Sequence, residues 1–178
     1  MSDIDRVLDL LPASASRPFV LGIDGRSGAG KSELAAAVVE RVPGAQLIHL
    51  EDAYRGWDGL RAGLETVADG VLRPLRESRG GSFQRYDWHR GELGETEEIP
   101  AAGVVVVEGC GAGSVVLAPY IDALVWLDAP EATRHRRAMD RDSDNWIDQW
   151  SSWAAQEDEI LAEHDARAAA DLLLDTSD

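Results

Sequence analysis

The segment best suited to chemistry is a glycine-rich run of eight residues, Gly25 to Ser32, with the sequence GRSGAGKS. It matches the pattern G-x-x-x-x-G-K-[ST], in which backbone N–H groups converge on the phosphate oxygens of a nucleotide. Lys31 would reach the β- and γ-phosphates, and Ser32 would ligate Mg²⁺. The residues predicted to bind ATP here are Gly25, Arg26, Ser27, Gly28, Ala29, Gly30, Lys31 and Ser32.

The segments on either side of this run predict the setting that the motif requires. Residues 18–24 (PFVLGID) are typical of a short buried strand, and residues 32–42 carry apolar side chains at the spacing of an amphipathic helix. The alternative is a glycine-rich turn that matches by chance. Because a strand precedes the run and a helix follows it, we expect a phosphate-binding loop.

Three carboxylates, Asp24, Asp52 and Glu108, lie at or just after the carboxyl ends of predicted strands, at the edge where a parallel sheet places its active site. We expect Asp52 to act in catalysis, as a base or by orienting an acceptor hydroxyl, because proteins mainly position the nucleophile in phosphoryl transfer. Glu108 is the expected second metal contact, through a water bound to Mg²⁺. For both residues the alternative is a carboxylate that caps a helix or begins a turn.

Three arginines recur at intervals of three and four residues, which places Arg134, Arg137 and Arg141 on one helix face. Forked guanidinium groups over the phosphates would neutralise the charge that develops during transfer. We therefore expect Arg134 and Arg141 to contact ATP and Arg137 to act in catalysis. The alternative is a solvated helix face whose arginines pair with neighbouring acidic side chains.

Two aromatic groups could contact a ligand. Residues 83–88 (FQRYDW) mix aromatic, cationic and anionic side chains, which suits recognition of a polar ring or a sugar; the alternative is an aromatic anchor for a long loop. Trp146, Trp150 and Trp153 share one helix face, and such a stripe packs in a core more often than against a ligand. We expect substrate contacts from the first group and core packing from the second.

The remaining elements alternate between strands and helices. An N-terminal helix and linker occupy residues 1–17, and residues 78–100 are predicted to be mostly loop. Further strands are predicted at residues 45–50, 103–108, 123–128 and 172–174, and further helices at residues 60–75, 114–120, 130–141 and 143–170. This order predicts an α/β fold of the three-layer P-loop NTPase type, in which a parallel five-stranded sheet carries helices on both faces.

The composition limits the partners and the setting. A chain of 178 residues with 44% apolar content fits a single domain over residues 1–178. Its formal net charge of −16 disfavours nucleic acid and anionic membranes, since both would be repelled. Cys110 is the only cysteine, the N-terminus is acidic and no run approaches the roughly 20 apolar residues of a membrane helix, so we expect a cytoplasmic protein. The four histidines lack metal-ligand spacing, so no structural metal is expected.

These landmarks together resemble the uridine kinase and phosphoribulokinase branch of the P-loop kinases. The matching segments are Ile23 to Ser32, Leu50-Glu51-Asp52-Ala53-Tyr54, Arg85-Tyr86-Asp87-Trp88 and Val107-Glu108-Gly109. The resemblance implies that Asp52 contacts the acceptor hydroxyl, that Tyr86 and Asp87 contact a nucleoside and that lid arginines touch the phosphates. Tyr54 lies one position closer to Asp52 than the tyrosine of the family's Asp-Ser-Phe-Tyr pattern does. His89 and Arg90 follow Trp88 directly, whereas in the family a His and an Arg come a few residues after the corresponding segment. The predicted acceptor contacts are Asp52, Tyr54, Arg85, Tyr86 and Asp87.

The leading interpretation is an ATP- and Mg²⁺-dependent kinase that phosphorylates a hydroxyl of a small metabolite, with a nucleoside such as uridine as the first choice. The same fold could serve a sugar acid, a vitamin precursor or a nucleoside monophosphate, the last through a clamp of arginines. The candidates for that clamp are Arg55, Arg61, Arg79 and Arg85. The rival from another class is a regulatory module that binds ATP without transferring phosphate. A homodimer is a further option.

Overall fold

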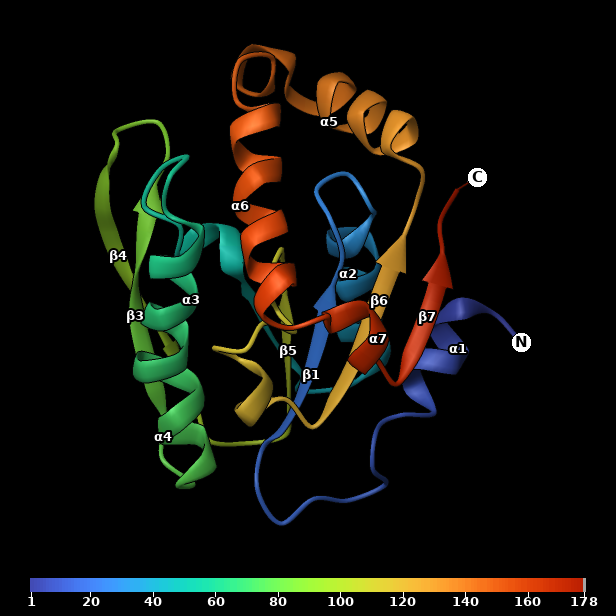
Figure 1. Cartoon of the computed structure of the whole chain (residues 1–178). Helices are drawn as coiled ribbons and strands as arrows, with labels where there is room; N and C mark the ends of the chain where they lie inside the picture. The colour runs from blue at the N-terminus through green and yellow to red at the C-terminus, as the bar shows by residue number, and fades with distance from the viewer. Residues whose placement is uncertain (178) are drawn as a thin grey trace.

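The structure, a computed structural model, describes residues 1–177. Its centre is a sheet of five parallel strands in the order β2-β5-β1-β6-β7 (Figure 1). The predicted α/β fold with a parallel five-stranded sheet is thereby confirmed. The strands are β1 (Phe19–Asp24), β2 (Gln46–His49), β5 (Val104–Glu108), β6 (Ala123–Asp128) and β7 (Leu172–Asp175).

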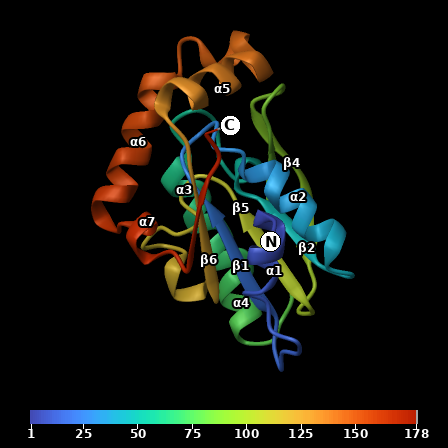
Figure 2. The same cartoon turned by 90° about the vertical axis from the view of Figure 1, so that its right-hand side faces the viewer.

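Helices cover both faces of this sheet, as the side view in Figure 2 shows. One face carries α1 (Asp3–Leu8) and α2 (Lys31–Arg41), and the other carries α3 (Leu60–Val67), α6 (Trp150–Glu163) and α7 (Ala166–Ala169). Side chains that alternate along β1 explain this arrangement. Leu21 and Ile23 pack into the cluster that includes α1 and α2, whereas Val20 packs into the cluster that includes α3 and α6. A strand covered on both faces needs apolar residues at successive positions, which is the pattern of the sequence.

The strand order brings the loops that follow β1, β2 and β5 next to one another. β5 lies between β1 and β2, although it comes later in the chain than both. In the observed register Glu108, the last residue of β5, is level with His49 on one side and with Ile23 on the other. The three carboxyl ends therefore meet at one edge, which is where open α/β sheets bind ligands.

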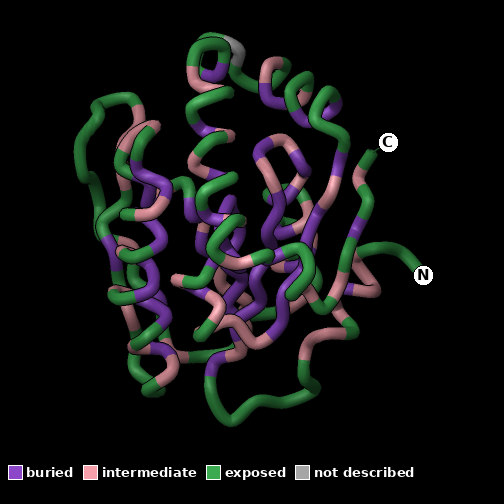
Figure 3. Tube along the Cα trace, viewed as in Figure 1, coloured by how far each residue is buried: buried purple, intermediate pink, exposed green. Residues whose placement is uncertain are grey.

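The prediction of a loop over residues 78–100 is wrong. The segment forms an antiparallel hairpin of β3 (Gly81–Asp87) and β4 (Glu92–Ile99), which make a second, two-stranded sheet. β4 has the sequence ELGETEEI, and glutamate and glycine have low intrinsic preference for strands. Pairing with β3 and burial of Phe83 and Ile99 against the core outweigh that preference. Most of β4 is exposed (Figure 3).

The prediction of one helix over residues 143–170 is also wrong. α5 (Glu131–Trp146) extends past its predicted end with a non-helical Asp142 inside it, at φ −162° and ψ 69°. A second break precedes α6, and a third separates α6 from α7. Short polar side chains stabilise these breaks by local hydrogen bonds: Asn145 Nδ2 donates to Asp142 Oδ2 at 2.6 Å, and Ala168 N donates to Asp165 Oδ1 at 3.0 Å.

The other predicted helices are present in altered form. α3 continues through a π-helical stretch (Ala68–Leu72) into α4 (Arg73–Arg76), which matches the helix predicted over residues 60–75. The helix predicted over residues 114–120 is reduced to a 3-10 turn at Ala118–Tyr120. Among residues 1–177, no helix is both long and apolar enough to cross a membrane.

A charged cluster stabilises the end of the sheet opposite to the three carboxyl ends. Asp122, which precedes β6, accepts hydrogen bonds from Arg17 at 2.7 Å, from Arg76 at 2.8 Å and from the backbone N–H of Val20 at 2.9 Å. Burial raises the pKa of Asp122, but these donors outweigh burial and lower its pKa to about 2. The cluster therefore stabilises the fold through an ionised carboxylate.

We expect Asp122→Asn to lower the free energy of unfolding at pH 7 by about 2 kcal/mol, because hydrogen bonds to a charged group are lost. The contribution of Asp122 is full above the unfolded-chain pKa of about 3.9 and disappears as the pH falls toward the folded value of about 2. Urea unfolding at pH 7 and pH 3 measures both effects. Equal destabilisation of the variant at the two pH values would contradict the assignment.

Candidate active site

The predicted phosphate-binding loop connects β1 to α2, and its glycines adopt conformations that other residues avoid. Gly28 has φ +80° and Gly30 has φ +93°. A Cβ at Gly28 would stand 2.2 Å from the carbonyl oxygen of Arg134, so α5 also requires a glycine there. The chain then enters α2 at Lys31, which directs the N-terminus of an eleven-residue helix toward the loop.

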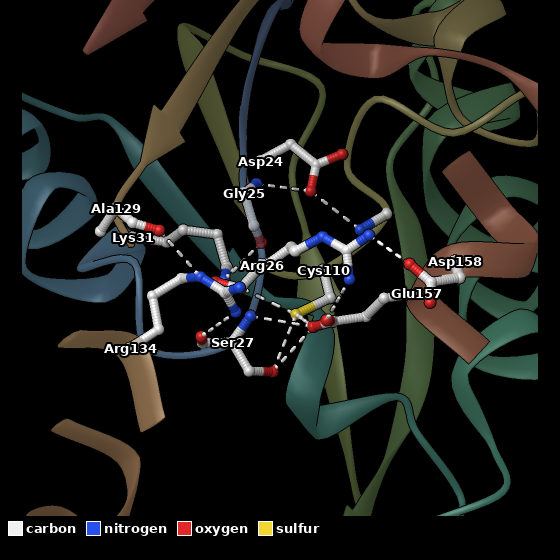
Figure 4. A network of polar contacts seen from close by, with 11 residues as sticks. Asp24, Gly25, Arg26, Ser27, Lys31, Cys110, Ala129, Arg134, Glu157 and Asp158 are labelled. Atoms are coloured by element: carbon white, nitrogen blue, oxygen red, sulfur yellow. Dashed lines mark hydrogen bonds and ion pairs between the residues drawn. The ribbon is translucent and has the colours of Figure 1, made fainter. Parts of the chain in front are cut away.

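Lys31 is folded back over its own loop. Its Nζ donates to the carbonyl oxygens of Gly25 at 2.7 Å and of Arg26 at 3.0 Å (Figure 4). The residue is 8% exposed. Burial lowers the pKa of Lys31, but the negative side chains around it, Glu108 and Glu157 among them, more than offset burial, so its pKa is raised. The lysine therefore stays charged beside the space where phosphates would bind.

Ser32 and Glu108 place two oxygen donors next to each other at the start of α2. Ser32 Oγ donates to Glu108 Oε1 at 3.1 Å, at the point where α2 begins and β5 ends. Mg²⁺ is commonly bound through one or two protein oxygens together with substrate phosphates. Among residues 1–177, no group of three or more His, Cys, Asp or Glu side chains could hold a metal by itself. These donors fit a metal that binds together with a nucleotide.

His49 shares the carboxylate of Glu108. Its Nδ1 lies 2.6 Å from Glu108 Oε1, and Glu108 itself is 4% exposed. The hydrogen bond to Glu108 raises the pKa of His49, although partial burial of the ring opposes this effect. The imidazolium and a metal ion would therefore compete for the same oxygen.

Asp24, the last residue of β1, has a structural position. Its carboxylate accepts hydrogen bonds from the backbone N–H groups of Gly25 at 2.7 Å, Gly111 at 3.0 Å and Gly113 at 2.7 Å. These bonds join the loop after β1 to the loop after β5. Asp24 lies behind the phosphate loop and does not line either of the two large cavities described next.

A cavity of about 340 Å³ opens beside the phosphate loop. At one end it is lined by Lys31, Ser32 and Glu108. The rest of its wall mixes polar side chains with aromatic rings that pack on one another: Trp57 lies 4.8 Å from Trp146 and 5.2 Å from Trp88 between ring centroids, and Tyr54 lies 5.1 Å from Trp153. The aromatic residues that line it are Tyr54, Trp57, Trp88, Trp146 and Trp153.

Of the two acidic residues that follow β2, Glu51 lines this cavity and Asp52 does not. Asp52 forms an ion pair with Arg85 at 2.9 Å, and Arg85 also lies 3.7 Å from Glu97 on β4. The indole N–H of Trp88 donates to the carbonyl oxygen of Glu51 at 3.0 Å and so fixes the backbone at this position. The acid pair after β2 is thus divided between the cavity and the hairpin.

The other predicted acceptor contacts are also divided between the cavity and the hairpin. Tyr54 lines the cavity, but its hydroxyl donates to the carbonyl oxygen of Cys110 at 2.7 Å. Burial raises the pKa of this hydroxyl well above its ordinary value. Tyr86 and Asp87 are not among the lining residues; Asp87 caps the hairpin turn by accepting from the backbone N–H of Arg90 at 3.0 Å, which lowers its pKa.

The three arginines of α5 have different positions. Arg134 is 8% exposed and donates to the carbonyl oxygens of Ala129 at 3.1 Å and Ser27 at 3.2 Å. Arg137 donates to the carbonyl oxygen of Thr176 at 2.6 Å and lies 3.5 Å from that of Gly28. Both hold backbone around the phosphate loop. Arg141 is exposed and lines the first cavity as well as a second one.

The second cavity, of about 520 Å³, lies on the other side of the loop. Gly28, Lys31, Ser32 and Arg141 line both cavities, so the two meet at the phosphate loop. The second cavity is also lined by Asp3, Gly30, Glu33, Arg137 and Thr176.

Sequence reasoning missed several residues that line the cavity. Trp57 lies between Gly56 and Gly59, a few residues after the acid pair Glu51 and Asp52. A tryptophan in a glycine-flanked loop at this place is the sequence feature that could have identified it as a cavity residue. Trp146 and Trp153 pack in the core as expected, with exposures of 8% and 4%, and also line the cavity. Of the arginines suggested as a monophosphate clamp, none lines the cavity; Arg61 pairs with Glu163 and Arg79 pairs with Glu77.

The His49–Glu108 pair predicts a pH-dependent stability. Because the pKa of His49 is raised in the folded state, the pair contributes fully below the ordinary histidine pKa of about 6.5 and is lost as the pH rises through the raised value. We expect the wild type to lose more unfolding free energy than His49→Gln between pH 6 and pH 9. Urea unfolding of both proteins measures this difference, and parallel pH profiles would refute it.

Solved structures of kinases share this fold. A possible uridine kinase from Bacillus stearothermophilus covers 97% of this chain and 97% of its own, with a TM-score of 0.70 and 22% identity. A proposed fructose transport system kinase from a Silicibacter species covers 96% of both chains, with a TM-score of 0.59 and 19% identity. D-glycerate 3-kinase from Cryptococcus neoformans covers 82% of this chain and 80% of its own, with a TM-score of 0.54 and 13% identity. No family model and no curated protein matches the chain. The chain therefore has the fold of these kinases, as its resemblance to the uridine kinase branch predicted.

Proposed function

We propose that the protein is an ATP- and Mg²⁺-dependent kinase that phosphorylates a hydroxyl of a small metabolite. The observation that carries this proposal is the pair of cavities that meet at Gly28, Lys31 and Ser32. One cavity would hold the nucleotide and the other the acceptor. A module that only binds ATP has no need of an additional cavity such as the one lined by the tryptophans.

The residues of the phosphate loop would divide the work on the nucleotide. Backbone N–H groups of the loop and the N-terminus of α2 would bind the phosphate oxygens. Lys31 would leave the carbonyl oxygens of Gly25 and Arg26 and neutralise the transferred phosphoryl group. Ser32 and Glu108 would hold Mg²⁺, which when bound reduces the negative charge on the phosphates. Arg141, which faces both cavities, is the arginine best placed to approach that phosphoryl group.

Two neighbouring carboxylates could orient the acceptor hydroxyl. The sequence pattern favours Asp52, but its ion pair with Arg85 occupies it at the hairpin. Glu51 lines the same cavity as Lys31 and Glu108, and the bond from Trp88 to its carbonyl oxygen fixes its backbone. We therefore assign the orienting role to Glu51, with Asp52 holding the hairpin against it through Arg85.

The wall of the cavity favours an acceptor with a flat ring and no negative charge. Tryptophan faces stack on planar rings, and Trp57, Trp88 and Trp146 surround the cavity. Glu51 and Asp142, which also line it, would repel a sugar acid or a nucleoside monophosphate. The cations Lys31 and Arg141 line the nucleotide cavity too and would be engaged by ATP. A nucleoside meets these requirements, with uridine as the first compound to test.

We expect acceptor-dependent ADP release when the protein is incubated with Mg²⁺-ATP and a nucleoside. The matched panel contains nucleosides, their monophosphates, sugar acids and vitamin precursors. Lys31→Ala should lower turnover about 100-fold or more, because a charge that stabilises the transition state is removed. ATP binding without turnover on any acceptor would instead favour the regulatory module.

We expect Glu51→Gln and Asp52→Asn to change different kinetic parameters. Loss of the residue that orients and deprotonates the hydroxyl should lower kcat by about 100-fold or more with little change in ATP affinity, and we predict this for Glu51→Gln. Asp52→Asn should mainly raise the acceptor KM, because the hairpin loses its ion pair. Steady-state kinetics with calorimetric ATP binding separates the two, and the reverse pattern would restore Asp52 as the orienting residue.

A further inference from the structure

The phosphate loop is held from behind by a carboxylate of α6 that the proposed reaction does not use. We propose that Glu157 is a positioning residue that fixes the amide of Ser27 and couples the phosphate loop to the wall of the acceptor cavity. This inference rests on the proposed function, because it concerns communication between the two cavities.

The contacts of Glu157 converge on a single oxygen. Its Oε1 accepts hydrogen bonds from Ser27 N at 2.8 Å, from Ser27 Oγ at 2.9 Å and from Cys110 Sγ at 3.1 Å (Figure 4). Its Oε2 lies 3.7 Å from Arg26 Nη1, and the next residue of α6, Asp158, pairs with Nη2 of the same arginine. Two successive residues of α6 therefore hold two successive residues of the phosphate loop.

Glu157 holds the loop without entering the space for ligands. It is 5% exposed and borders a small pocket with Asp24 and Gly25, whereas neither large cavity includes it among its lining residues. A buried carboxylate is unfavourable unless several donors compensate it, and an apolar side chain could fill the same place without that requirement. What the carboxylate adds is a directed bond to one amide of the loop.

The same turn of α6 reaches the acceptor cavity. Trp153 precedes Glu157 by four residues, which places both on one face of the helix, and Trp153 lines the cavity. Gln156 Nε2 donates to the carbonyl oxygen of Trp57 at 2.7 Å, and Gln156 Oε1 accepts from Leu60 N at 3.4 Å. This stretch of α6 thus carries one cavity tryptophan, contacts the phosphate loop and contacts the loop that carries another cavity tryptophan.

A packed helix shifts as a unit, so these contacts couple the two sites. If a nucleotide changes the position of Ser27, Glu157 transmits the change to α6, and Gln156 transmits it to residues 53–60. The coupling is reciprocal, so an acceptor pressed against Trp153 would tighten the loop around ATP by the same factor. Binding of one substrate would thereby prepare the site for the other.

The test is amide hydrogen exchange of the full chain with and without Mg²⁺ and AMP-PNP, a nucleotide that does not transfer phosphate. In the wild type we expect slower exchange in the phosphate loop, in α6 and in residues 53–60. In Glu157→Ala we expect nucleotide to bind, with slower exchange confined to the phosphate loop. Glu157→Gln, which keeps an oxygen for the Ser27 amide, should restore the response of α6.

Two further variants sharpen the result. Glu159→Ala removes an exposed carboxylate of the same helix and should respond as the wild type does. Gln156→Ala should keep the response of α6 and lose that of residues 53–60, and it carries the test if Glu157→Ala fails to fold. An unchanged α6 in nucleotide-bound wild type, or a full response in Glu157→Ala or Gln156→Ala, would overturn the coupling alone. Absence of AMP-PNP binding to the wild type would overturn the proposed function and the coupling together.

Discussion

The carboxylate of Asp24 is the contact on which the organisation of the site depends. At 2% exposure it accepts three backbone N–H groups, from Gly25, Gly111 and Gly113, and so joins the loops that follow β1 and β5. Burial raises its pKa, while the three amides favour the ionised form. Lys31 and Ser32 follow the first of these loops, and Glu108 precedes the second. Their mutual geometry is therefore set by a residue that does not line either large cavity.

The phosphate loop is held by groups whose charges match its backbone. Arg134 and Arg137 of α5 donate to carbonyl oxygens of the loop, whereas Glu157 of α6 accepts from a loop amide. The guanidinium groups of α5 donate to carbonyl oxygens of the loop, and the carboxylate of α6 accepts from a loop N–H group, so the two helices hold different backbone groups of the same loop. The arginine face is thus largely part of the loop's scaffold, and Arg141 at its end remains beside both cavities. A helix that is hydrogen-bonded to the loop in this way can also shift when the loop changes position.

The sequence was sufficient for the parallel sheet because each predicted strand is a largely apolar run that ends at, or directly before, a carboxylate, as in 103–108. It failed for β4, since a strand rich in glutamate is stabilised by its partner and not by its own preferences. It also could not show that Glu51 lines the cavity and Asp52 does not, because spacing within the chain cannot reveal which of two adjacent side chains turns toward a cavity. Trp153 both packs in the core and lines the cavity, whereas helical periodicity predicts only the core packing.

The exposed β4 strand has a consequence for association between molecules. A hairpin edge offers unpaired N–H and C=O groups that could template pairing with another chain, the route to uncontrolled aggregation. Here the sequence ELGETEEI places carboxylates along that edge, and two copies meeting there would bring like charges together. β4, whose sequence has a low intrinsic preference for the strand conformation, thus also resists pairing with a second copy of itself. A functional homodimer would therefore have to form through another surface.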